Sequence, residues 1–147
     1  MKQRSFPSLP LLAASFLILL FVYTACSKLL HASQFIQTMR LTPFAGRFAS
    51  SLAWMVPGIE LLISMLLFLP STRRRGLFYA FLLMLSFTLY VGAMLLLLPN
   101  LPCSCGGVIK SMGWKTHLVF NAACTLLAWT GWRVSSNDRR TSNLLLQ

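Results

Sequence analysis

Four long apolar segments, joined by short polar connections, occupy most of this 147-residue chain. They cover about residues 9–30, 50–69, 77–98 and 115–133. Crossing the hydrocarbon core of a bilayer as an α-helix takes about 20 consecutive apolar residues, and the segments lack the alternation of a membrane β-strand. The sequence therefore predicts an all-α integral membrane protein, a four-transmembrane-helix bundle that forms a single domain over residues 1–147.

The composition agrees with a membrane environment. Hydrophobic residues make up 56% of the chain and charged residues only 10%, whereas about a quarter of the residues of a soluble domain are charged. The net charge of +11 comes from basic residues that lie in short clusters between the apolar segments. Such clusters are typical of topology signals and of contacts with anionic lipid headgroups. We expect a lipid bilayer as the environment and no nucleic-acid partner.

The basic residues also predict an orientation, because Lys and Arg are enriched on the cytoplasmic side of a membrane. One side collects Lys2, Arg4, Arg73, Arg74, Arg75, Arg133, Arg139 and Arg140, and the other side the smaller set Lys28, Arg40, Arg47, Lys110 and Lys115. This difference predicts a multi-pass protein of the bacterial cytoplasmic (inner) membrane with both termini in the cytoplasm. Residues 134–147 would then form a cytoplasmic tail.

The N-terminal segment has a second interpretation. A basic start, an apolar stretch and the sequence Thr24-Ala25-Cys26-Ser27 resemble a bacterial lipoprotein signal with Cys26 as the lipidated residue. Tyr23 argues against this, because such signals prefer a small aliphatic residue at that position. The apolar character also resumes at Leu29, as in a helix that continues.

Two cysteines one residue apart, in Cys103-Ser104-Cys105-Gly106-Gly107, lie between the third and fourth segments. A disulfide within Cys-X-Cys closes a very small ring, and strained, exposed disulfides are the labile or catalytic kind. The predicted orientation places this loop outside the cytoplasm, where disulfides persist. A zinc site needs four ligands, and His117 with the two thiols supplies three, so we expect no metal site. The alternative is that both cysteines are inert small residues in a turn.

Polar residues recur on one face of the fourth segment. Trp114, His117, Asn121 and Cys124 follow one another at spacings of three and four residues. Polar residues within a membrane face the interior of a bundle or a wet cavity. His117 titrates near neutral pH and could accept a proton from a thiol. Alternatively, His117 and Asn121 cap the helix and bond across helices, and Cys124 only packs.

Glu60 is the one acidic residue within an apolar segment. A carboxylate at that depth is either protonated or paired, and it marks a functional site by default. Lys28 is the candidate partner if the first helix extends past it, although its ammonium could equally reach the outer interface. We expect Glu60 to belong to a functional or structural polar core.

Several stretches resemble a known family, the methylamine-utilisation MauE family, which is grouped with the DoxX-like four-helix membrane proteins. They are residues 23–29 (Y-T-A-C-S-K-L), residues 57–61 (P-G-I-E-L), the loop at residues 103–107 (C-S-C-G-G) and residues 114–121, read as W-x-x-H-x-x-F-N. The resemblance runs from about Ser8 to Trp132, and its most specific parts are the loop and the start of the fourth helix.

The resemblance implies a role in maturing a periplasmic, disulfide-rich subunit of methylamine dehydrogenase, and more broadly redox-associated work on thiols outside the cytoplasm. Cys103 and Cys105 would be the exchanging pair, with an extracytoplasmic thioredoxin-like or disulfide-containing protein as partner. Cys26 and Cys124 are candidates for a second thiol pair. The residues themselves name no cofactor, and a looser likeness to other four-helix thiol oxidoreductases implies quinone as an electron acceptor.

The sequence thus leads to a hypothesis of thiol-disulfide exchange at the Cys103–Cys105 loop, with His117 and Glu60 as supporting catalytic residues. Whether the chain is itself a thiol-disulfide oxidoreductase stays open. Two other classes remain. The protein could be a non-enzymatic assembly or accessory subunit whose thiols only staple the outer loop. It could also be a small quinone- or solute-handling protein that uses Glu60 and His117 as a proton path.

Overall fold

The computed structural model describes residues 8–40, 46–97 and 113–144, and these residues are helical apart from short turns. The elements are α1 (Ser8–Leu30), α2 (Ala32–Arg40), the short 3-10 helix η1 (Gly46–Phe48), α3 (Ala49–Phe68), α4 (Arg73–Leu97) and α5 (Trp114–Leu144). The described ranges contain no strand. The all-helical prediction is therefore confirmed.

Three of the helical segments are long and apolar enough to cross a membrane. They are Leu9–Leu30, Gly46–Phe68 and Arg73–Leu97. Their outward faces carry large apolar side chains, such as Leu19, Leu30 and Leu96, that are exposed in the structure. Because contiguous apolar surface of this kind is rare on soluble monomers, the chain is a membrane protein. Among the described helices, α5 is long but does not meet the same apolar criterion.

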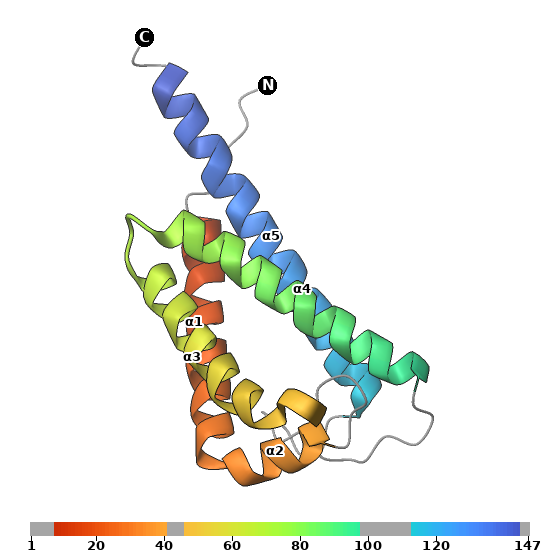
Figure 1. Ribbon diagram of the computed structural model, residues 1–147. Helices are drawn as coiled ribbons and strands as arrows, with labels where there is room; N and C mark the ends of the chain where they lie inside the picture. Colours follow the sequence, from red (N-terminus) through yellow and green to blue (C-terminus); the bar gives the residue numbers. More distant parts are fainter. Residues whose placement is uncertain (1–7, 41–45, 98–112, 145–147) are drawn as a thin grey trace.

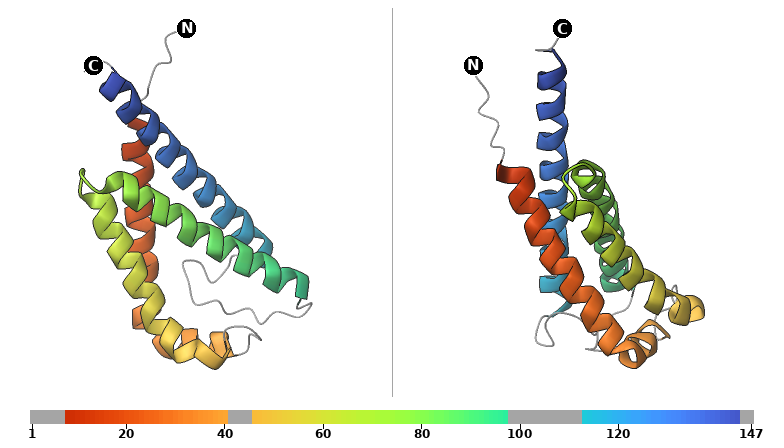
Figure 2. Two further views of the ribbon diagram at one scale, coloured as in Figure 1. Left: turned by 45° about the horizontal axis from the view of Figure 1, so that its top comes forward. Right: turned by 90° about the vertical axis from the view of Figure 1, so that its left-hand side faces the viewer.

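The four long helices pack as a ring. Helix α1 packs along α3 and α5, and α4 packs along α5 and α3. Helices α1 and α4 also approach each other over a short stretch, whereas among the described residues no Cα atom of α3 lies within 8 Å of a Cα atom of α5. The start of α1 and the end of α5 lie at one end of the molecule (Figure 1). The other end carries α2, the end of α4 and the start of α5, and the two further views agree with this arrangement (Figure 2).

The core of the ring is built from apolar residues of different sizes, alanines among them. It comprises Ala13, Ala14, Leu17, Phe21, Ile63, Leu67, Leu77, Ala80, Met84, Cys124 and Ala128. The alanines allow the backbones to approach closely, as small residues do at helix contacts in membranes. A second, separate cluster joins Phe35 and Met39 of α2 to Ala49 and Ala53 of α3.

Helix α2 is an element that the apolar pattern did not predict. It follows α1 after a break at His31 and turns across the end of the bundle (Figure 1). Phe35 and Met39 are buried on its inner side, whereas Ser33, Gln37 and Arg40 are exposed. A short helix with one apolar face and one polar face belongs at a surface rather than across a bilayer.

Two helices extend further than their apolar segments. Helix α4 begins at Arg73, since the Thr72 carbonyl already accepts the first backbone hydrogen bond, from Gly76 N–H. Helix α5 continues to Leu144, beyond residue 133, where we expected the helix to give way to a tail. Residues 133–144 contain neither Gly nor Pro, the two residues that most disfavour a helix. The Ser136 hydroxyl also donates to the Trp132 carbonyl along this part of α5.

The turn between α3 and α4 depends on Gly76. A Cβ atom at this position would lie 2.9 Å from Leu67 N and 3.0 Å from the Leu66 carbonyl carbon, both backbone atoms of α3. Neither atom can move without displacing the helix. At Gly58, in contrast, an added Cβ would meet nothing within 4 Å.

We therefore expect Gly76→Ala to lower the free energy of unfolding by about 1–3 kcal/mol, the usual cost of overpacking. Gly58→Ala, the matched control, should leave stability unchanged or raise it slightly, because Ala favours helix over Gly. Unfolding by SDS titration in mixed micelles measures both. Equal stabilities for the two variants would contradict the close α3–α4 approach.

Candidate functional site

A buried ion pair joins α1 to α3. Lys28 Nζ lies 2.5 Å from Glu60 Oε1, and the side chains of Lys28 and Glu60 are only 13% and 1% exposed. The pair exists because α1 continues as helix through Cys26 and Ser27 to Leu30, which carries Lys28 onto the face that packs against α3. Removing two charges from water costs several kcal/mol per ion, which only close pairing offsets.

Lys28 also interacts with the other two long helices. Its ammonium lies 5.6 Å from the centre of the Phe87 ring of α4, a geometry in which the ring attracts a cation. Its charge also acts on the imidazole of His117 in α5. Lys28 is therefore a single residue of α1 that interacts with α3, α4 and α5.

The surroundings of Glu60 leave part of its carboxylate without a partner. The Ser64 hydroxyl donates to the Glu60 backbone carbonyl at 2.9 Å, one turn along α3. The Thr24 hydroxyl lies near the carboxylate. However, this hydroxyl donates its hydrogen bond to the Phe21 carbonyl, at 3.2 Å. Glu60 Oε2 is buried and has no hydrogen-bond partner among the described residues. Such an atom is costly to leave unpaired, so it marks a position where a proton or a polar group can be accepted.

The polar residues of α5 line its inner face. His117 is partly buried, and its Nδ1 atom is buried with no hydrogen-bond partner within the described ranges. Asn121 and Cys124 are buried, and the Asn121 carbonyl accepts a hydrogen bond from Thr125 Oγ1 at 2.8 Å. Thr125 Oγ1 is also 3.0 Å from Thr88 Oγ1 of α4. Trp114 begins α5.

The polar stripe and Glu60 do not form one continuous cluster. Asn121 and Cys124 belong to α5, and in the described part of the chain no Cα atom of this helix lies within 8 Å of a Cα atom of α3. No hydrogen bond or ion pair joins His117 to Glu60 in the described part of the chain. The sequence predicted Glu60 and the polar residues of α5 as site residues, but it did not point to Thr24 or Phe87. Thr24 stands four residues before Lys28, a spacing that signals a shared helix face, whereas nothing in the sequence points to Phe87.

The cysteines fall into two groups. Cys26 is exposed on α1 and Cys124 is buried in the core, and both are free thiols. Cys103 and Cys105 lie outside the described residues. They belong to the connection between Leu97, the last residue of α4, and the start of α5. Within the described ranges, no three His, Cys, Asp or Glu side chains gather as a metal site would require.

The apolar helices and the buried Lys28–Glu60 pair define the class of protein: an α-helical membrane protein with a charged interior. The family comparison then gives its membership. The model of the family described as methylamine utilisation protein MauE matches residues 7–134, and the chain belongs to this family. The resemblance noted in the sequence is thereby confirmed. No curated protein and no solved structure was found to match the chain.

The ion pair predicts a specific pattern of stability. Lys28→Met leaves Glu60 as an uncompensated buried charge, and we expect a loss of about 3 kcal/mol, as for other broken buried pairs. The double variant Lys28→Met/Glu60→Leu removes both charges and should recover most of that loss. SDS-induced unfolding at pH 8, where an unpaired carboxylate is costly to bury, measures the difference.

The control is Lys115→Met, which removes an exposed lysine of α5 and should change stability little. If Lys28→Met were as stable as the control, or if the double variant were the least stable of the three, the pair would not hold α1 to α3.

Proposed function

We propose that this membrane protein of methylamine-utilisation type exchanges disulfides with an extracytoplasmic protein through Cys103 and Cys105. The observation that carries the proposal is that the cysteine connection leads into a helix whose first turn holds a buried polar atom without a partner in the described residues. That connection ends at α5, and His117, with its unpartnered Nδ1, lies in the first turn of this helix. Helix α1, which packs along α5, carries Lys28, and Lys28 pairs with Glu60 of α3. In the proposal, His117 is the proton acceptor for the thiol pair and Lys28 supplies a positive charge.

In this proposal, α5 is the fourth membrane-spanning helix. Its exposed residues between 117 and 132 are Val119, Ala123, Leu126 and Trp129, and all four are apolar. Two polar residues in this stretch, Asn121 and Thr125, are buried. A helix with lipid-compatible side chains outside and polar side chains inside is suited to the bilayer, because polar groups there need partners within the bundle.

Four passes place the two ends of the bundle on opposite sides of the membrane. Arg73, Arg74, Arg75 and Arg133 gather at the end where α5 leaves the bundle. By the positive-inside rule this end faces the cytoplasm, and the cysteine connection at the other end faces the oxidising side of the inner membrane. Both chain termini are then cytoplasmic.

The exchange proceeds in two steps that conserve atoms and electrons. The thiolate of one loop cysteine attacks a disulfide of the partner protein, forming a mixed disulfide and releasing one partner thiolate. The second loop cysteine then attacks its neighbour, so the loop becomes Cys103–Cys105 disulfide and the partner leaves as a dithiol. The reverse sequence oxidises the partner. His117 accepts the proton of the attacking thiol, since the thiolate is the nucleophile. The positive charge of Lys28 and the negative charge of Glu60 balance each other during this transfer.

The pairing of the two cysteines predicts a trapping experiment. Replacing the resolving cysteine alone, by Cys103→Ser or Cys105→Ser, should stabilise the mixed disulfide, which appears on a non-reducing gel as a heavier band that a reductant removes. The double variant should show none of this band, because no thiol remains in the loop. The experiment uses the full chain in its native membrane, with rapid acid quenching and thiol blocking.

Cys26→Ser/Cys124→Ser provides the matched control and should leave the band pattern of each single variant unchanged. If the adduct persisted in the Cys103→Ser/Cys105→Ser variant, or appeared in neither single variant, the assignment of the exchanging pair would fall.

A further inference from the structure

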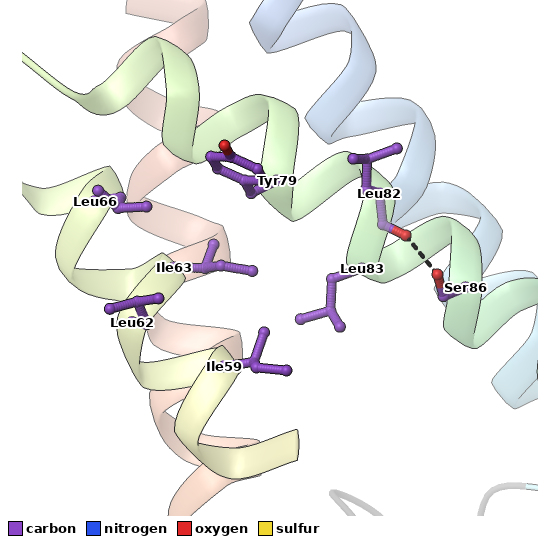
Figure 3. Close-up of a pocket in the computed structure, with 8 residues that line it drawn as sticks. All are labelled: Ile59, Leu62, Ile63, Leu66, Tyr79, Leu82, Leu83 and Ser86. Atoms are coloured by element: carbon purple, nitrogen blue, oxygen red, sulfur yellow. Dashed lines mark hydrogen bonds between the residues drawn. The ribbon is translucent and has the colours of Figure 1, made fainter. Parts of the chain in front are cut away.

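A lipid-facing groove runs between α3 and α4. It has a volume of about 450 Å³, within the range of ordinary ligand sites. Ile59, Leu62 and Leu66 form its α3 side, and Tyr79, Leu82 and Ser86 are on its α4 side (Figure 3). The Ser86 hydroxyl donates to the Leu82 carbonyl at 2.9 Å. Its donor is therefore satisfied within α4, and the groove remains largely apolar.

One end of the groove lies at the α3–α4 turn. Leu66, which lines the groove, has a carbonyl that accepts a hydrogen bond from Thr72 Oγ1 at 2.9 Å. The neighbouring Leu67 carbonyl accepts one from Arg73 Nε at 3.3 Å. These bonds fold the turn onto the end of α3. The apolar groove is thus directly followed by the run of three arginines that opens α4.

A fourth arginine lies on the same side. Arg74 Nε donates to Ser136 Oγ of α5 at 3.1 Å, and Arg133 precedes Ser136 by about one turn of that helix. The Arg133 guanidinium lies 5.0 Å from the centre of the Trp129 ring and 5.9 Å from that of Trp132. Aromatic rings and arginines occur together at the interface between hydrocarbon and headgroups.

These cations lack counter-charges within the chain. Glu60 and Asp138 are its only two acidic residues, and Glu60 is paired with Lys28. Asp138 could neutralise at most one of Arg73, Arg74, Arg75 and Arg133. At least three of the four guanidinium groups therefore have no acidic side chain of the chain to pair with. Arg75 is exposed and makes no ion pair within the described ranges.

We propose that this side of the protein binds an anionic phospholipid, with its phosphate at the Arg73–Arg75 turn and one acyl chain in the α3–α4 groove. The groove belongs to two spans, Gly46–Phe68 and Arg73–Leu97, so a hydrocarbon chain is the occupant that its surroundings supply. Basic sites between membrane helices bind anionic headgroups, and guanidinium groups match phosphate oxygens in a bidentate manner. The proposal does not depend on the thiol chemistry above.

The test is native mass spectrometry of the full chain in detergent, titrated with dioleoyl-phosphatidylglycerol or dioleoyl-phosphatidylcholine. These lipids have the same acyl chains and differ in headgroup charge. We expect the first to bind about tenfold more tightly. Arg75→Gln should weaken its binding about fivefold, since one basic residue near a headgroup contributes about that factor. Lys115→Gln, at the opposite end of the bundle, should have no effect.

The groove is tested separately. Leu82→Trp and Leu62→Trp fill it from α4 and α3, and both should weaken phosphatidylglycerol binding. Leu89→Trp adds the same bulk to an exposed position of α4 outside the groove and should not. Equal binding of the two lipids, or no effect of Arg75→Gln, would overturn the headgroup site. Equal effects of Leu82→Trp, Leu62→Trp and Leu89→Trp would overturn the assignment of the acyl chain to the groove.

Discussion

Lys28 carries a charge between the four long helices, and each helix provides part of its surroundings. It extends from α1, pairs with Glu60 of α3, lies over the ring of Phe87 in α4 and acts on His117 in α5. A buried ion is tolerated only when its partners are held in place. The ring of helices and the ion pair therefore depend on each other. The packing brings Lys28 and Glu60 together, and separating α1 from α3 would cost free energy because it would leave both buried charges unpaired.

The same logic explains the polarity of α5. Its exposed side chains through the middle of the helix are apolar, whereas Asn121 and Thr125 are buried. Thr125 meets Thr88 of α4, so the α4–α5 contact includes hydrogen bonds as well as apolar packing. The described helices are thus apolar on much of their outer surface and polar along part of their interior. That interior includes two buried atoms without partners in the described chain, Glu60 Oε2 and His117 Nδ1. We attribute the proposed proton handling to these atoms.

Much of this fold could be predicted from the sequence, because long apolar segments have few alternatives in a membrane. The rest depends on weaker signals. Helix α2 is only nine residues long and mixes polar with apolar residues, so no length criterion finds it. The extension of α5 to Leu144 was missed because its polar residues resemble a solvated tail. Within the site, the charges of Lys28 and Glu60 made their pairing a natural expectation, since each needs a partner in apolar surroundings. The contact with Phe87 depends on how α4 packs against α1, which no local pattern encodes.

The central claim is that Cys103 and Cys105 lie on the outer side of the membrane, opposite Arg73–Arg75, and change oxidation state there. Thiol labelling of intact cells that carry the Cys26→Ser/Cys124→Ser variant tests it most directly, because the loop then holds the only cysteines of the chain. A membrane-impermeant maleimide is applied with and without prior treatment by an impermeant reductant. The account predicts labelling from outside the cell that increases after reduction. Labelling that appears only after the cells are opened, or that reduction leaves unchanged, would contradict it.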